Sequence, residues 1–249
     1  MKACVIIPAR FNSSRFPGKP ITKLNGKEMI IWVAEACAKA VNAKHVYIAT
    51  DDRRISEIVL KKGYQVILTS SDLLTGTDRV AEASKKLNYE IFINVQGDEP
   101  LIDYKDILKA IELKRKYPEY IINSFCNIGK NENPENRNLP KVAITESNFL
   151  IYISRALIPQ SKKDLSNYVF KKQVCIYAYS RNDLKKFLSY GRKSEIEKIE
   201  DIEILRFFEL GIGIKMYEAS QSSLAVDSPE DVKSVEHELR KKGDLYEEI

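Results

Sequence analysis

The stretch ACVIIPARFNSSRFPGKP, residues 3–20, decides the fold. Its first part, ACVIIPA (3–9), is an uninterrupted apolar run, which is typical of a strand buried on both faces of a parallel sheet. Its second part, RFNSSRFPGKP (10–20), is a polar loop punctuated by glycine and proline. Because ligands of parallel α/β sheets bind beyond the carboxyl ends of the strands, this loop lies where a functional site is expected.

Helix and strand patterns alternate after this first strand. Helical patterns cover residues 28–40, 52–63, 76–87 and 104–116, and apolar strands cover residues 45–50, 65–69 and 90–95. This alternation predicts an α/β fold with a mostly parallel sheet and helices on both faces. One domain spanning residues 1–249 is expected, because a chain of this length with 44% hydrophobic residues can form one large α/β core.

The pattern changes after about residue 120. Strands are expected at 120–126, 171–180 and 214–220, and a hairpin at 141–159 that turns at the tripeptide ESN. The middle of the chain therefore predicts an antiparallel excursion from the parallel sheet. Within it, residues 127–170 suit a lid or a dimerisation element.

The C-terminal part predicts two more helices. Residues 194–211 are expected to form one helix that begins with a capping box made by Ser194 and Glu197. Apolar residues at three-residue spacing are expected to form one face of this helix. Residues 223–242 predict a short strand and then a helix with Ser228 as its N-cap.

Composition argues against several classes of function. The 40 basic and 35 acidic residues leave a formal net charge of +5, which is weak evidence for nucleic-acid binding and suits an anionic small substrate equally well. The four cysteines show no CxxC spacing, and two histidines offer little for a Ser–His–Asp triad. No apolar run approaches about 18 residues and no leader pattern is found, so we expect a cytoplasmic protein without membrane insertion.

The loop after the first strand carries groups that bind phosphate. It contains Arg10, Arg15 and Lys19, together with two serine hydroxyls and Gly18. Cationic side chains, combined with backbone N–H groups of a loop that turns at glycine, can hold a polyphosphate. The spacing of a Walker A or GxGxxG motif is missing, so a solvated basic loop is the alternative.

Two carboxylates that follow apolar stretches are candidates for a metal site. Asp98 comes just after the strand that ends at residue 95, and Asp227 precedes the last helix. Carboxylates at such positions can hold Mg²⁺, which binds few protein ligands and keeps positions for phosphate oxygens. The alternative for Asp98 is a helix-start signal, but Asp103 is better placed for that role. Asp51 and Asp52 also follow a strand, and one of them is expected to be the N-cap of the next helix.

Seven segments together resemble one enzyme family. They are VIIPARFNSSRFPGKPI, IATDD, GTDRVAEA, NVQGDEPLI, SRALIP, QVCIYAY and AVDSPED, and the resemblance runs in order from residue 4 to about residue 240. The chain resembles the 3-deoxy-manno-octulosonate (Kdo) cytidylyltransferases, or CMP-Kdo synthetases. The resemblance implies a three-layer, Rossmann-like fold of the nucleotide-diphospho-sugar-transferase type and a homodimer. It also implies a Mg²⁺-dependent reaction of CTP with a 3-deoxy-2-ulosonic acid, which releases pyrophosphate and yields a CMP-sugar for lipopolysaccharide precursor synthesis.

The resemblance also implies roles for individual residues. The implied catalytic residues are Arg10, Lys19, Asp98 and Asp227, of which Asp98 and Asp227 would hold the metal. The implied nucleotide-binding residues are Pro8, Ala9, Arg10, Ser13, Arg15, Lys19, Thr75, Arg79 and Gln96. The implied sugar-acid-binding residues are Arg155, Gln173, Tyr177 and Glu203.

Two positions depart from the usual pattern of that family. Ile204 stands where a glutamine is usual, and Cys175 stands where a glycine is usual. A site that loses a hydrogen-bonding group can accept another substrate, so a modified acid such as the 8-amino-8-deoxy analogue is one interpretation and neutral change is the other. The alternatives for the whole chain are a cytidylyltransferase for another ulosonic acid, such as a sialic-type nonulosonate, and a non-catalytic nucleotide-binding protein of the same fold.

Overall fold

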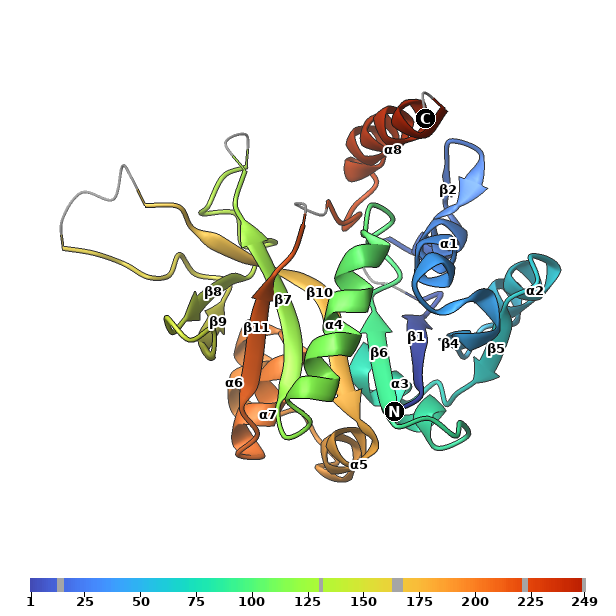
Figure 1. The fold of residues 1–249 in the computed structure, drawn as a ribbon. Helices are drawn as coiled ribbons and strands as arrows, with labels where there is room; N and C mark the ends of the chain where they lie inside the picture. The colour runs from blue at the N-terminus through green and yellow to red at the C-terminus, as the bar shows by residue number, and fades with distance from the viewer. Residues whose placement is uncertain (13–15, 130–131, 163–167, 221–223, 248–249) are drawn as a thin grey trace.

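A nine-stranded sheet runs through the centre of the described part of the chain (Figure 1). The structure is a computed structural model that describes residues 1–12, 16–129, 132–162, 168–220 and 224–247. The strand order along the main path is β11-β7-β10-β6-β1-β4-β5. The bounds of these strands are β1 (Ala3–Ala9), β4 (Val46–Thr50), β5 (Gln65–Leu68), β6 (Ile91–Val95), β7 (Ile121–Asn127), β10 (Lys171–Ser180) and β11 (Ile214–Glu218).

The sheet is mostly parallel, as predicted, and β10 is the strand that reverses direction inside it. It runs antiparallel to β6 and β7, whereas β1 pairs in parallel with β4 and β6. The predicted antiparallel excursion was too broad, because β7 and β10 are largely buried strands of the central sheet. The antiparallel appendage is the predicted hairpin, made by β8 (Lys141–Ile144) and β9 (Leu150–Ser154) and joined to β10.

Helices cover both faces of the sheet, which gives a three-layer α/β architecture (Figure 1). Their bounds are α1 (Met29–Val41), α2 (Arg53–Lys61), α3 (Gly76–Ser84), α4 (Tyr104–Lys116), α5 (Arg181–Ser189), α6 (Glu195–Glu200), α7 (Arg206–Glu209) and α8 (Asp231–Glu247). Short elements complete the description: β2 (Lys23–Leu24), β3 (Lys27–Glu28), and the 3₁₀ helices η1 (Lys19–Ile21), η2 (Ala43–His45) and η3 (Glu203–Leu205). A membrane-spanning helix is absent from the described residues.

The first strand explains why the layers form. Val5 and Ile7 of β1 pack into the core beneath α1, α2 and α4, whereas Cys4 and Ile6 pack into the core beneath α3, α5 and α7. Alternate side chains of a strand point to opposite faces, so an uninterrupted apolar strand must be covered twice. Its carboxyl end, at Ala9, then opens into the loop that contains Lys19.

The predicted single helix over residues 194–211 is wrong. The capping box of Ser194 and Glu197 is present, but α6 ends at Glu200, and Asp201 takes a left-handed conformation with φ 51°. Ile199, placed on the expected apolar face, is 82% exposed. A strict three-residue spacing drifts around a helix of 3.6 residues per turn, so these residues cannot share one face. The break lets η3 and α7 pack against the sheet.

The prediction of a short strand before the last helix is also wrong. Residues 224–227 form no strand, and α8 begins at Asp231. The Ser228 N–H and hydroxyl both donate to Asp231 Oδ2, at 2.8 and 3.0 Å, and the N–H bond is the one that the third residue of a capping box accepts. Of the two aspartates offered as the cap of α2, Asp52 takes that position, and Asp103 caps α4 as predicted.

Candidate active site

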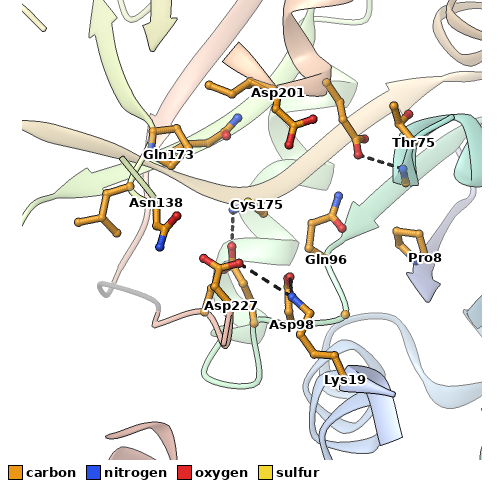
Figure 2. A pocket seen from close by; sticks show the side chains of 18 of the residues that line it. Pro8, Lys19, Thr75, Gln96, Asp98, Asn138, Gln173, Cys175, Asp201 and Asp227 are labelled. Atoms are coloured by element: carbon orange, nitrogen blue, oxygen red, sulfur yellow. Dashed lines mark hydrogen bonds and ion pairs between the residues drawn. The ribbon is translucent and has the colours of Figure 1, made fainter. Parts of the chain in front are cut away.

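A cavity of about 610 Å³ lies at the carboxyl ends of β1 and β6, next to β10 (Figure 2). Every predicted site residue that the structure describes lines this cavity: Pro8, Ala9, Arg10, Lys19, Thr75, Arg79, Gln96, Asp98, Arg155, Gln173, Tyr177, Glu203 and Asp227. Ser13 and Arg15 lie outside the described residues. The fold thus brings together residues that the sequence spreads over more than 200 positions, while their individual roles stay predictions.

The ammonium group of Lys19 lies between the two candidate metal-binding carboxylates. Its Nζ is 2.6 Å from Asp98 Oδ2 and 3.9 Å from Asp227 Oδ1. It also donates to the carbonyl oxygen of Val226 at 2.9 Å. The carbonyl of Asp98 in turn accepts from Val226 N at 2.9 Å, so a backbone hydrogen bond holds the C-terminal segment against the turn after β6. Figure 2 shows the three charged side chains pointing toward one another.

These oxygen atoms fit a hard divalent cation. Two carboxylates and the Val226 carbonyl already converge on one positive charge, and both carboxylates are about a quarter exposed. Mg²⁺ takes oxygen ligands and normally keeps positions for phosphates and water, so a pair of protein carboxylates suffices. In the described part of the chain, no cluster of three or more His, Cys, Asp or Glu side chains forms a fuller metal cage.

The turn after β6 separates the roles of its two adjacent carboxylates. Gly97 allows a close approach to β1, because a Cβ at this position would lie 3.2 Å from the carbonyl oxygen of Pro8. Asp98 then faces Lys19, whereas the buried Glu99 accepts from Cys175 N at 2.9 Å. Glu99 therefore ties the turn to β10, which fixes the direction of Asp98.

The N-terminus of α3 forms another wall of the cavity. A Cβ on Gly76 would lie 3.4 Å from Pro8 Cγ, 3.4 Å from Gln96 Nε2 and 3.3 Å from Glu203 Oε1, so these three side chains meet around the glycine. The Glu203 carboxylate accepts from the N–H groups of Gly76 at 2.9 Å and Thr77 at 2.7 Å. A helix N-terminus stabilises a carboxylate, but burial dominates and raises the pKa of Glu203 above its usual range.

Some predicted binding residues are engaged within the protein. The Thr75 hydroxyl caps α3 by accepting from Asp78 N at 3.1 Å. Arg79 is buried, donates to Thr69 Oγ1 and lies 3.5 Å from Asp51, and burial lowers the pKa of its guanidinium. These two side chains shape the wall of the cavity, whereas Arg10 is exposed at its edge.

The Arg155 guanidinium is also heavily bonded. It donates to three carbonyl oxygens, those of Glu200 at 2.5 Å, Asp201 at 3.0 Å and Arg137 at 2.9 Å. It therefore joins the end of α6 to the loop that precedes β8. A substrate carboxylate at this position would have to share the guanidinium with these carbonyls. The nearby Gln173 side chain is held as well, because its Nε2 donates to Asn123 Oδ1 at 2.9 Å.

The two positions that depart from the family pattern have different surroundings. Ile204 is 1% exposed and packs into the core with α7, so it does not line the cavity as expected. In the tight 3₁₀ turn of η3, neighbouring side chains point in different directions, and Glu203 takes the position that faces the cavity. Cys175 does line the cavity, and burial raises the pKa of its thiol well above the usual range.

Sequence reasoning missed several polar residues that line the cavity. They come from the loop before β8, from the start of β10 and from the region around α6: Glu132, Asn133, Asn136, Asn138, Lys172, Lys193 and Asp201. The asparagine-rich composition of residues 127–141 was a signal for a polar loop. It contained no spacing that pointed to a shared cavity.

A mostly parallel α/β sheet whose strand ends present cations beside a carboxylate pair is typical of enzymes that act on nucleotide phosphates. Residues 4–217 match the family described as "Cytidylyltransferase". The chain is 38% identical over 248 residues to the 8-amino-3,8-dideoxy-manno-octulosonate cytidylyltransferase of Shewanella amazonensis, a match that covers 96% of this chain and 99% of the relative. The chain belongs to the cytidylyltransferase family and is a nucleotidyltransferase.

A solved structure agrees with this assignment, and a second one agrees with the fold. A CMP:2-keto-3-deoxy-manno-octonic acid synthetase complexed with CTP superimposes with a TM-score of 0.88 at 33% identity, covering 97% of this chain and all of that one. A cytidylyltransferase from Leptospira borgpetersenii, with a TM-score of 0.63 and 19% identity, covers 95% of this chain and 85% of the other. At that identity the second match bears on the fold alone.

Proposed function

We propose that this enzyme transfers CMP from CTP to the anomeric hydroxyl of a 3-deoxy-2-ulosonic acid, either Kdo or its 8-amino analogue, and releases pyrophosphate. The observation that carries this proposal is the Lys19 ammonium held between Asp98 and Asp227 in the cavity at the strand ends. The names of the relative from Shewanella and of the CTP-bound synthetase support the two substrates. The product would serve lipopolysaccharide precursor synthesis in the cytoplasm.

The chain's own residues supply positioning and charge. The anomeric hydroxyl attacks the α-phosphorus of CTP and pyrophosphate leaves, so the enzyme must align the reactants and stabilise negative charge. The Lys19 ammonium lines the cavity beside the carboxylate pair and Arg10 is exposed at the edge of the cavity, so both would face the phosphates of a bound CTP. Pro8, Gln96 and the N-terminus of α3 form the wall against which the nucleoside would pack.

We assign the metal position to Asp98 and Asp227. Mg²⁺ bound there would neutralise phosphate charge and lower the pKa of a coordinated hydroxyl. The oxygen atoms of Asp98, Asp227 and Val226 that surround Lys19 Nζ are ligands of the kind that Mg²⁺ takes, which supports this assignment.

The 8-amino acid is the proposed preferred substrate. The half-buried Glu203 carboxylate faces the cavity and accepts hydrogen bonds from the Gly76 N–H and from the N–H and hydroxyl of Thr77, and in the described part of the chain it forms no ion pair. An ammonium group on the substrate would complement such a carboxylate. The curated relative from Shewanella, which acts on the 8-amino acid according to its name, supports the same choice.

Pyrophosphate release with CTP and a panel of ulosonic acids tests the function. The panel contains Kdo, 8-amino-3,8-dideoxy-manno-octulosonate and a sialic-type nonulosonate. We expect turnover with the two octulosonates and a higher kcat/KM for the amino form. A tenfold or greater preference for Kdo would contradict the proposed specificity, and turnover with the nonulosonate alone would contradict the substrate class.

We also propose a homodimer formed through residues 127–170. Large apolar side chains exposed in this region support it, since Ile151 on β9 is 58% exposed and Val169 is 53% exposed. Light scattering during size-exclusion chromatography should give twice the chain mass of 28.5 kDa at micromolar concentration. A monomer at that concentration would contradict the proposal.

A further inference from the structure

Lys19 occupies the oxygen-lined position that a divalent cation would need. Its Nζ contacts Asp98 Oδ2 at 2.6 Å and the Val226 carbonyl oxygen at 2.9 Å, and lies 3.9 Å from Asp227 Oδ1. A divalent cation bound by both carboxylates would lie among the same oxygen atoms. An ammonium and a metal ion cannot share them at bonding distance, because two positive charges so close together repel strongly.

The backbone around Lys19 is fixed, so a single side chain can exchange these partners. Gly18 has φ 73° and its N–H donates to the Phe11 carbonyl at 2.9 Å, which closes the base of the loop. Pro20 is buried directly after Lys19. The Lys19 side chain is 16% exposed at the cavity wall, so its rotation alone can carry the ammonium toward a bound polyphosphate.

We infer that Lys19 competes with the divalent cation for the Asp98–Asp227 pair, and that a nucleoside triphosphate makes the pair available by drawing the ammonium onto its phosphates. The inference rests on the proposed function, because it uses its metal site and its nucleotide. It predicts weak divalent-cation binding by the free enzyme and positive coupling between nucleotide and metal. The coupling is reciprocal, since each ligand then favours the same position of the lysine.

Manganese binding by the full chain without nucleotide tests the competition. Free Mn²⁺ is quantified by electron paramagnetic resonance during titration of the wild type, Lys19→Met, and the matched control Lys23→Met, which removes the same charge from an exposed residue nearby. We expect Lys19→Met to bind Mn²⁺ at least tenfold more tightly than the wild type, and Lys23→Met to resemble the wild type. Equal affinity of the wild type and Lys19→Met would overturn the inference.

A second variant separates failure of the inference from failure of the metal assignment. Asp98→Asn in the Lys19→Met background should abolish the tight Mn²⁺ binding. If the wild type and Lys19→Met bind equally and Asp98→Asn removes that binding, the carboxylate site stands and the competition is refuted. If neither binds Mn²⁺ at millimolar concentration, the metal site itself is refuted and the inference with it. Thermal melting followed by circular dichroism confirms that each variant is folded.

The ammonium itself provides a readout independent of metal affinity. In protein labelled with ¹⁵N at the lysine Nζ, the Lys19 signal is assigned by its loss in Lys19→Met. Adding CTP in the presence of a chelator should shift this signal, because the ammonium exchanges carboxylate for phosphate partners. Adding submillimolar Mg²⁺ alone should leave it in place. A shift with Mg²⁺ alone, or none with CTP, would contradict the exchange.

Discussion

Replacing Arg206 by methionine should destabilise the protein strongly although the residue lies outside the cavity. Arg206 is fully buried, and its guanidinium donates to Asp78 Oδ1 at 2.8 Å and to Glu197 Oε1 and Oε2 at 2.7 Å each. It also lies 3.8 Å above the ring of Phe187. Methionine fills a similar volume with an apolar chain, so the main effect is the loss of the charge.

The magnitude follows from the two carboxylates that would remain. Asp78 is 3% exposed and Glu197 is 1% exposed, so neither can recover full hydration. Removing one partner of a buried ion pair lowers the free energy of unfolding by about 3–5 kcal/mol. For a chain of this size each kcal/mol lowers Tm by about 2–4 °C, so we expect a decrease of at least about 6 °C.

Urea unfolding of the wild type and Arg206→Met measures this loss. Arg192→Met is the control, because Arg192 pairs with Glu195 on the surface, where 59% of its side chain is exposed, and such pairs contribute less than about 1 kcal/mol. Adding Asp78→Asn and Glu197→Gln to Arg206→Met should restore part of the stability, since neutral amides cost less to bury than charges. A loss below about 1 kcal/mol for Arg206→Met would refute the reasoning.

Three further predictions concern the cavity. Asp98→Asn should lower kcat at least about 100-fold with the fold intact, because losing the charge of one metal ligand should cost more than the roughly 2.7 kcal/mol of transition-state stabilisation that corresponds to this factor. Asp103→Asn, which alters only a helix cap, is the control. A near-normal kcat of Asp98→Asn would contradict the metal assignment. Burial raises the pKa of Glu203 above 4.5, so the folded protein binds the Glu203 proton more tightly than the unfolded chain does. The free energy of unfolding of the wild type should therefore fall relative to that of Glu203→Gln as pH rises from 4.5 toward the raised pKa. Urea unfolding across this pH range measures the difference, and a relative rise would contradict the prediction. Cys175 lines the cavity with a thiol whose pKa burial raises, so it should react slowly with a thiol reagent at pH 7.5 in native protein, and mass spectrometry showing rapid labelling there would contradict this.

The sheet could be predicted because its signals are local. The apolar run of β1, the helix caps at Asp52 and Asp103 and the alternating pattern between them each depend on neighbouring residues. The break at Asp201 could not be predicted in the same way. A left-handed aspartate is only a weak sequence signal for a helix end, and the buried ion pair of Arg206 with Asp78, which the break accommodates, joins residues far apart in the sequence.

The cavity was predicted mainly through resemblance, since spacing cannot show which strand ends meet. Spacing indicated that Asp98 and Asp227 follow apolar stretches, and the fold brings each of them beside Lys19. Side-chain direction was harder to predict. Arg155 is held by backbone carbonyls and Ile204 turns into the core, because the local backbone at the end of α6 and in η3 determines where these side chains point.

The second carboxylate of the site owes its position to an apolar neighbour. Val226 is fully buried in a cluster with Met29, Leu101 and residues of α8. Its N–H donates to the Asp98 carbonyl and its own carbonyl accepts from Lys19, each at 2.9 Å. Asp227 follows Val226 directly in the chain, so the burial of this valine helps to set the distance between Asp98 and Asp227. The hydrophobic cluster that contains Met29 of α1 with Val235 and Leu239 of α8 therefore contributes to the geometry of the proposed metal site, because it holds the segment that places Asp227 beside Lys19.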